Sequence, residues 1–320
     1  MIMRAAVGID IGGTSIKTGI VGEDGSLLRR RTVPTEAQAG AEALKRKLAG
    51  IVREALAYGE QNGIEIAGAG IGTAGQVLAG SGMVAGATAN LPGWAGVPLG
   101  PWLRSETGLD VAVDNDVNMI AAGEAWLGAG KRWDDFLCVA LGTGIGGCLV
   151  IGRRVYHGRD GFAGEIGHQT VVIDGLPCSC GGRGCWEQYA SVTALMRLAA
   201  ESPASGAPRW ESPTALFDAA RRGDGAAVAV IDLYARYVAV GLANLIHALN
   251  PPAIVIGGAV TAQGDFLFER IRRETALRLM PAFREAAPVP IVPAALGEDA
   301  GVIGAAGVLL AMRRDGRERR

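Results

Sequence analysis

The chain has 320 residues, of which 49% are hydrophobic and 20% are charged, and its net charge at pH 7 is −1. This composition excludes a disordered protein, and the near-zero charge argues against a strongly basic nucleic-acid binder or membrane-surface protein. Glycine accounts for 49 residues, roughly twice the usual share of about 7%, without a collagen period. We therefore expect many tight turns and close backbone approaches.

The first half of the chain predicts strands that alternate with helices. Three short strands are expected near 4–10, 15–21 and 26–34, separated by glycine turns, and a helix with one apolar face follows near 36–61. Buried strands are expected at 66–73 and 110–114, with a helix near 98–107 between them. Such alternation predicts an α/β fold with at least partly parallel strands.

The second half repeats part of this pattern. A strand at 136–141, a glycine turn at 142–147 and a strand at 148–151 resemble the strand, glycine-threonine turn and strand around Asp10 to Thr14. We interpret this as a weak internal duplication, with one copy in each of two domains that face each other across a cleft. Further helices are expected near 226–250 and 300–313, and a strand near 253–256 ends in Gly257 and Gly258.

No segment is expected to enter a membrane. The best apolar run that we identify, residues 300–312, is shorter than the ~20 residues needed to span a bilayer. A signal peptide is not expected either, because Asp10 interrupts the first apolar stretch. We therefore expect a cytoplasmic protein with reduced thiols.

The cysteines form the most specific pattern. Cys178, Cys180 and Cys185 lie in a glycine-rich segment ten residues after His168. Three thiolates and one imidazole satisfy tetrahedral Zn²⁺, and glycines let a tight loop wrap the metal. Because the protein fills all four positions, the pattern predicts a structural zinc site. The other two cysteines, Cys138 and Cys148, lie in apolar strands and are expected in the core.

The glycine turns do not predict a dinucleotide fold. Two G-x-G-x-x-G matches, beginning at Gly70 and Gly142, do not open a helix within a short βαβ unit, and the sequence contains no P-loop motif. Glycine hairpins can nevertheless line an anion with their backbone N–H groups. Residues 10–17 resemble the first phosphate motif of the sugar kinase, Hsp70 and actin superfamily, in which a carboxylate at a strand end holds hydrated Mg²⁺ beside such a turn.

Residues 164–168 and 178–191 together resemble the signature of the ROK family (repressors, ORFs, kinases), and in particular of its bacterial glucokinase branch. Matching segments run over almost the whole chain. The resemblance implies two RNase H-like α/β domains of the actin, Hsp70 and hexokinase superfamily around a central cleft. Residues 1–116 plus about 300–320 would form the small domain, and residues 117–299 the large domain with the zinc loop and sugar site.

The resemblance also implies an activity, the ATP- and Mg²⁺-dependent phosphorylation of glucose at its 6-hydroxyl to glucose 6-phosphate. It makes Asp116 the catalytic base, although an Asp at this point is also a common helix N-cap. The sugar would bind Asn90, Asn115, Asp116, Glu165, His168 and Glu187; the nucleotide and its phosphates would bind Asp10, Gly12, Gly13, Thr14, Lys17, Thr143, Gly144, Gly257 and Gly258; structural zinc would bind His168, Cys178, Cys180 and Cys185.

Two alternatives stay open at this point, and a third is disfavoured. An N-acetylhexosamine kinase, acting on N-acetylglucosamine or N-acetylmannosamine, shares nearly all these motifs, and a sugar-binding regulator without turnover shares many of them. A repressor of the same family would need a DNA-reading domain, for which the nine residues before Asp10 are too few. We therefore expect sugar and nucleotide as partners, no nucleic acid, and a homodimer or homotetramer. His157 and His247 match no motif, and Asp114 is interpreted as noncatalytic.

Overall fold

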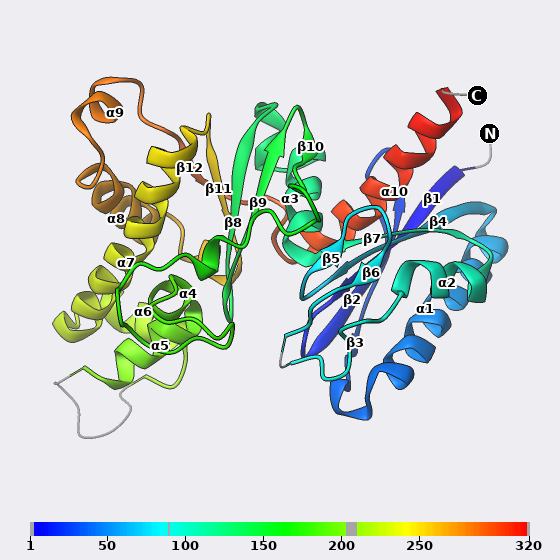
Figure 1. Cartoon of the computed structure of the whole chain (residues 1–320), viewed down its shortest axis with the longest axis horizontal. Helices are drawn as coiled ribbons and strands as arrows, with labels where there is room; N and C mark the ends of the chain where they lie inside the picture. The colour runs from blue at the N-terminus through cyan, green and yellow to red at the C-terminus, as the bar shows by residue number, and fades with distance from the viewer. Residues whose placement is uncertain (1–2, 89, 203–209, 319–320) are drawn as a thin grey trace. The chain divides into compact units, whose positions relative to one another are not determined.

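A computed structural model describes residues 3–88, 90–202 and 210–318, with side chains up to Arg313 (Figure 1). Contacts divide the chain into two compact units. The first unit comprises Met1–Asp134, Cys148–Ala163 and Glu298–Arg320, and the second comprises Asp135–Gly147 and Gly164–Gly297. The domain boundaries expected from the sequence stay a prediction; the helix that begins at Asp116 belongs to the first unit by its contacts.

Two five-stranded sheets have the same strand pattern, which agrees with the predicted duplication. In each sheet, three strands consecutive in the chain lie in reverse order and are followed by two later strands. The first sheet has the order β3 (Leu27–Pro34), β2 (Ser15–Gly22), β1 (Met3–Ile11), β4 (Ile64–Thr73) and β7 (Asp110–Asn115). The second has the order β10 (Arg154–Val155), β9 (Ile145–Ile151), β8 (Phe136–Leu141), β11 (Ile254–Gly257) and β12 (Ile291–Pro293).

The helices fall into two groups by unit. The first unit holds α1 (Ala41–Asn62), α2 (Leu99–Thr107), α3 (Asp116–Trp126), α10 (Ala300–Glu318) and a two-stranded ribbon of β5 (Val77–Leu78) and β6 (Met83–Val84). The second holds α4 (Glu187–Ala190), α5 (Val192–Ala200), α6 (Pro213–Arg221), α7 (Gly225–Leu249), α8 (Asp265–Ala276) and α9 (Pro281–Glu285).

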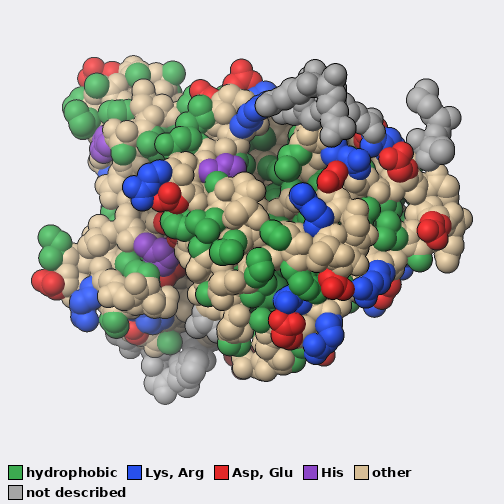
Figure 2. Space-filling model, turned by 45° about the vertical axis from the view of Figure 1, so that its right-hand side comes forward, with side chains coloured by type: hydrophobic (Ala, Val, Ile, Leu, Met, Phe, Trp, Pro, Cys, Tyr) green, Lys and Arg blue, Asp and Glu red, His purple; other side chains and the backbone are tan. Residues whose placement is uncertain are grey.

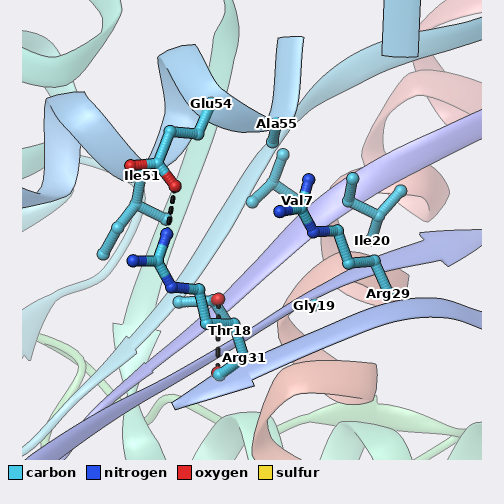
Figure 3. Close-up of a pocket in the computed structure, with 9 residues that line it drawn as sticks. All are labelled: Val7, Thr18, Gly19, Ile20, Arg29, Arg31, Ile51, Glu54 and Ala55. Carbon is cyan, nitrogen blue, oxygen red and sulfur yellow. Dashed lines mark hydrogen bonds and ion pairs between the residues drawn. The ribbon is translucent and has the colours of Figure 1, made fainter. Parts of the chain in front are cut away.

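The first sheet is covered on both faces, which explains the nearly continuous apolar sequence of β1. Val7 and Ile9 pack in one core with Leu48 and Val52 of α1, whereas Ala6 packs in a second core with residues of α10. Under α1, a cavity of about 30 Å³ is left beside the ion pair of Arg31 and Glu54 (Figure 3). Such a volume holds one or two water molecules and excludes a sugar or a nucleotide.

Glycines let the backbone of α10 pack directly against the backbones of the first sheet and of α3. A Cβ at Gly8 or Gly70 would overlap the carbonyl oxygen of Val302 or Ala305 of α10, and a Cβ at Gly304 would overlap the backbone of α3. These positions confirm that part of the high glycine content serves close backbone packing.

We expect Gly70→Ala to destabilise the protein by about 3 kcal/mol, because the added methyl group has no room beside the α10 backbone. Gly50→Ala is the matched control. Gly50 lies inside α1 with no atom within 4 Å of a Cβ, so alanine should stabilise the helix by ~0.5–1 kcal/mol. Urea unfolding followed by circular dichroism measures both, and a Gly70→Ala variant as stable as the wild type would contradict the packing argument.

Two helices differ from their sequence predictions. The helix expected at 36–61 begins only at Ala41, because Gly40 takes a φ of 86° that no helix interior allows. Among the described residues, α7 alone is long and apolar enough to cross a membrane, so the expectation that 300–312 is the best apolar run is wrong. More than half of the apolar window of α7 is buried, as in the core helix of a soluble protein.

Candidate functional site

In the first unit, acidic groups lie at the carboxyl ends of β1 and β7, the two strands that flank β4 in parallel. Asp10 of β1 pairs in register with Gly72 of β4, which in turn pairs with Asp114 of β7. Asp116, the first residue of α3, lies against Gly72, since a Cβ there would come within 3.3 Å of the Asp116 Cα atom. The fold therefore gathers three carboxylates at one edge of the sheet, where α/β proteins usually bind ligands.

Asp10 is a largely buried carboxyl group with a raised pKa. Burial, and next the negative charge of Asp116, raise its pKa to about 6, while the charge of Lys17 acts in the opposite direction. Lys17 is the direct cross-strand neighbour of Asp10, and its Nζ atom lies 3.6 Å from Glu298. Because the negative charges of Asp10 and Asp116 repel each other, this site has an electrostatic preference for a cation.

The turn after β1 is built around backbone hydrogen bonds. The N–H of Gly12 donates to the carbonyl of Ser15 (3.0 Å), and the hydroxyl of buried Thr35 donates to the carbonyl of Gly12 (2.6 Å). Gly13 lies against Asn90, whose Cβ would be 2.7 Å from a Cβ at position 13. The predicted phosphate turn and the predicted sugar ligand Asn90 thus meet within the first unit.

Asn115 and Asp116 make different hydrogen bonds at the start of α3. The helix N-cap is Asn115, whose side-chain oxygen accepts hydrogen bonds from the N–H groups of Val117 and Asn118. Its Nδ2 donates to the carbonyl of Gly75 at 3.0 Å. The alternative that Asp116 is the N-cap is therefore wrong, although Asp116 Oδ1 also accepts from the N–H of Val117 (3.0 Å).

In the second unit, the turn after β8 is tied to the start of α5. The N–H of Val192 donates to the carbonyl of Gly142, and the hydroxyl of Thr193 donates to that of Thr143, both at 2.8 Å. Gly258 follows β11 with a φ of 96° and lies directly against Leu141, where a Cβ would overlap its carbonyl. Four predicted nucleotide residues therefore lie at adjoining strand ends: Thr143, Gly144, Gly257 and Gly258.

The predicted zinc ligands come together in the same unit. One ligand atom each from His168, Cys178, Cys180 and Cys185 lies within 4.8 Å of all the others. The distance from Cys180 Sγ to Cys185 Sγ is 3.6 Å, and that from Cys178 Sγ to His168 Nδ1 is also 3.6 Å. Four donors at Zn–S and Zn–N bond lengths of about 2.0–2.3 Å around one centre are separated by about that distance, so the donor set fits tetrahedral zinc.

The thiols of this cluster differ in acidity. Burial raises the pKa of Cys185 to about 12 and raises that of Cys178, whereas a hydrogen bond with the Gly182 backbone lowers the pKa of Cys180. Since zinc binds thiolates, metal binding at this cluster would release protons.

Both glutamates predicted to bind sugar lie beside this cluster. Glu187 Oε1 accepts a hydrogen bond from Cys178 Sγ (3.1 Å) and lies 3.8 Å from His168 Nδ1. Glu165 Oε2 lies 3.7 Å from the other ring nitrogen, Nε2. The second oxygen of Glu187 would be 2.6 Å from a Cβ at Gly144, so a glycine there leaves room for the carboxylate.

One pair of polar side chains was missed at the sequence level. Asp114 Oδ2 lies 2.6 Å from His157 Nε2, and this hydrogen bond raises the pKa of His157. Both residues border a cavity of about 510 Å³ inside the first unit, together with apolar side chains such as Trp126 and Leu310. No short motif links residues 43 positions apart, and only Asp114 lay at the end of a predicted strand.

Basic and acidic side chains do not form separate patches on the face of the molecule shown in Figure 2. On the face in Figure 2, basic and acidic groups lie interspersed among apolar and neutral ones. This distribution agrees with the net charge of −1 and gives that face no extended basic patch for a nucleic acid.

Comparisons with known proteins agree over nearly the whole chain. The sequence model of the ROK family matches residues 6–312. The chain is 36% identical over 313 residues to a glucokinase of Thermotoga maritima, covering 95% of this chain and 96% of that protein. It is 38% identical over 318 residues to a glucokinase of Streptomyces coelicolor, with 95% and 97% coverage.

Among solved structures, a ROK family glucokinase from Streptomyces griseus in complex with glucose and AMPPNP is similar in fold, with a TM-score of 0.82. It is 36% identical in sequence, and the match covers 95% of this chain and 98% of that chain. With the two like sheets described above, these matches show that the chain belongs to the ROK family and has its actin- and hexokinase-like α/β fold.

Proposed function

We propose that the protein transfers the γ-phosphate of ATP to the 6-hydroxyl of glucose, which yields glucose 6-phosphate and ADP. The observation that carries this proposal is the similarity to ROK glucokinases at 36–38% identity over about 95% of the chain. Clustering of the predicted site residues within each unit supports it. The donor is proposed to bind as Mg·ATP.

Asp116 is proposed as the group that orients the 6-hydroxyl and accepts its proton. Its position fits this task, because Asn115 caps the helix and Asp116 need not supply the cap. Phosphoryl transfer passes through a loose transition state, so such a base mainly positions the nucleophile and collects the proton late.

Asp10 and the turn of Gly12, Gly13 and Thr14 are proposed to face Mg·ATP. A carboxylate whose pKa is about 6 gains most from a nearby cation, which restores its ionised form. Thr143, Gly144, Gly257 and Gly258 are proposed to bind the nucleotide from the second unit, and Lys17 to contribute positive charge. Mg²⁺ when bound would neutralise charge on the transferring phosphate.

Sugar hydroxyls are neutral groups that need paired donors and acceptors. We propose that Asn90, Asn115 and Asp116 from the first unit, and Glu165, His168 and Glu187 from the second, supply them. In the second unit this role is supported by the contacts of Glu165 and Glu187 with His168.

Zinc is proposed to be structural. With His168 Nδ1 and the three sulfur atoms as ligands, Nε2 stays on the side of Glu165, where it can meet a sugar hydroxyl. Metal binding would then fix the ring orientation of His168 and so preorganise the sugar site.

Cys180→Ser is expected to lose zinc and sugar affinity together. Removal of one of four ligands opens the site, and we expect glucose to bind about 10–100-fold more weakly, because His168 is no longer held. Metal analysis of the purified protein and isothermal titration with glucose measure the two effects. Ser179→Ala, an exposed neighbour outside the ligand set, is the control. Zinc loss with unchanged glucose affinity would separate the metal from the sugar site.

The activity itself is tested by following ADP release from Mg·ATP with glucose, N-acetylglucosamine, N-acetylmannosamine, mannose and fructose in separate reactions. The proposal expects the highest kcat/KM with glucose. A higher value with an N-acetylated sugar would make the protein an N-acetylhexosamine kinase. No turnover of any sugar by zinc-replete protein would leave the sugar-binding regulator, or another phosphoryl donor such as polyphosphate.

Location and assembly are proposed as well. We place the protein in the cytoplasm, in line with the buried apolar face of α7. A homodimer or homotetramer is supported by the exposed side chains of Leu277 and Met280 in the second unit, which are 66% and 57% accessible. Analytical ultracentrifugation measures the assembly state directly.

A further inference from the structure

The carboxylate of Asp114 lies at the point where β7 passes into α3. It is 9% exposed and two residues before Asp116. Its Oδ1 accepts hydrogen bonds from the N–H of Asn115 (2.7 Å) and from Nδ2 of Asn118 (2.8 Å). Asp114 therefore binds the backbone and the first turn of the helix that carry Asp116.

His157 supplies the hydrogen bond to the other oxygen of Asp114, at 2.6 Å. A buried carboxylate with one oxygen unpaired is unfavourable, and it recovers partners by moving. Because Asp114 Oδ1 holds the start of α3, any such movement would displace Asp116 with it.

The segment around His157 is itself fixed. The carbonyl of His157 accepts from the N–H groups of Gly161 (3.0 Å) and Ala163 (3.2 Å), which folds the segment into a compact loop. The carbonyl of Asp160 accepts from the N–H of Ala79 (3.2 Å), so the loop is attached to the residues after β5. His157 thus projects from an anchored backbone and is not a mobile surface side chain.

We propose that His157 is a positioning residue for phosphoryl transfer: its hydrogen bond to Asp114 holds the β7–α3 turn so that Asp116 keeps the geometry needed to orient the sugar hydroxyl. The inference rests on the proposed function, since it concerns the same base. It requires only an Nε2–H donor, which the imidazolium and the Nε2-protonated tautomer of neutral imidazole both supply.

Two substitutions separate positioning from simple stabilisation. His157→Leu removes the donor, and we expect kcat per folded molecule to fall roughly ten- to a hundred-fold, because small misplacements of a catalytic group have effects of this size. The KM values for glucose and ATP should stay within about three-fold. His157→Gln places an amide donor near the position of Nε2 and should recover most of kcat.

The pair is tested further in the Asp114→Asn background. If His157 acts through the buried carboxylate, His157→Leu should lower kcat less there than in the wild type. His247→Leu is the matched control, because His247 also makes a hydrogen bond through Nε2, which accepts from the N–H of Met280, and lies in the other unit. Its kcat should equal that of the wild type.

Steady-state kinetics of these variants at matched folded concentration, determined by circular dichroism, give the result. The positioning role would be overturned by an unchanged kcat for His157→Leu, by equal losses of kcat for His157→Leu and His157→Gln, or by a change confined to KM. In each of these cases, turnover by the wild type would leave the proposed function intact. Absence of sugar phosphorylation by the wild type would overturn both.

Discussion

Replacement of Asp116 by alanine or asparagine is expected to lower kcat by roughly 10²- to 10⁴-fold, the range typical of a lost general base. Glucose binding should persist, because the other proposed sugar ligands keep their positions and Asn115 still caps α3. A coupled assay for ADP gives kcat, and isothermal titration gives glucose affinity.

Asp110→Asn is the matched control for this experiment. Asp110 lies at the opposite end of β7, where it is half exposed and 3.4 Å from Arg313. Its substitution should leave kcat unchanged. Near-normal turnover by both Asp116 variants would show that another group orients the hydroxyl, and the proposed base would have to be abandoned.

Asp10→Asn is expected to make the nucleotide-free protein more stable while it removes most of the turnover. The wild-type carboxyl group has a pKa of about 6 in the folded protein and an ordinary value of 3.8, so its ionisation opposes folding. The difference of about 2 units corresponds to about 3 kcal/mol at pH 7.5. Asparagine has the same shape and no charge, so the free energy of unfolding should rise by up to that amount.

The stability gain of Asp10→Asn should depend on pH in a direction that follows from the raised pKa of Asp10. The penalty is absent below the unfolded pKa of 3.8, develops as the pH rises, and is complete above about 6. The stability gain of Asp10→Asn should therefore be largest at pH 7–8, about half as large near pH 5 and absent near pH 3.5. Urea unfolding at these pH values measures it. A variant less stable than the wild type at pH 7.5 would contradict the proposed cost of ionising Asp10 in the folded protein.

Sequence patterns predicted the architecture well where burial or periodicity was strong. The buried strand β4 and the helix α7 were expected close to their observed bounds, because apolar runs and one-sided seams arise directly from burial. The zinc cluster was predicted from four residues within 18 positions, whose side chains the structure does bring within 4.8 Å of one another.

Contacts between distant residues could not be predicted in this way. The pairing of Asp114 with His157 depends on how the segment after β10 lies against β7, and one sequence contains no record of that packing. The contact of Gly13 with Asn90 has the same origin. The start of α1 at Ala41 was missed because a single glycine, although a poor helix former, does not by itself end a helix. Only the φ of 86° at Gly40 shows that the helix begins after it.

The discontinuous first unit has a consequence for synthesis of the protein. β1 is covered by α10, about 290 residues later in the chain. At ~5–20 residues per second, the ribosome needs roughly 15–60 s to add that interval. During this time the face of β1 that will meet α10 has no cover, whereas residues 164–297 emerge as one uninterrupted stretch. The nascent first sheet therefore has a longer period of exposure to chaperones and to aggregation than the second unit.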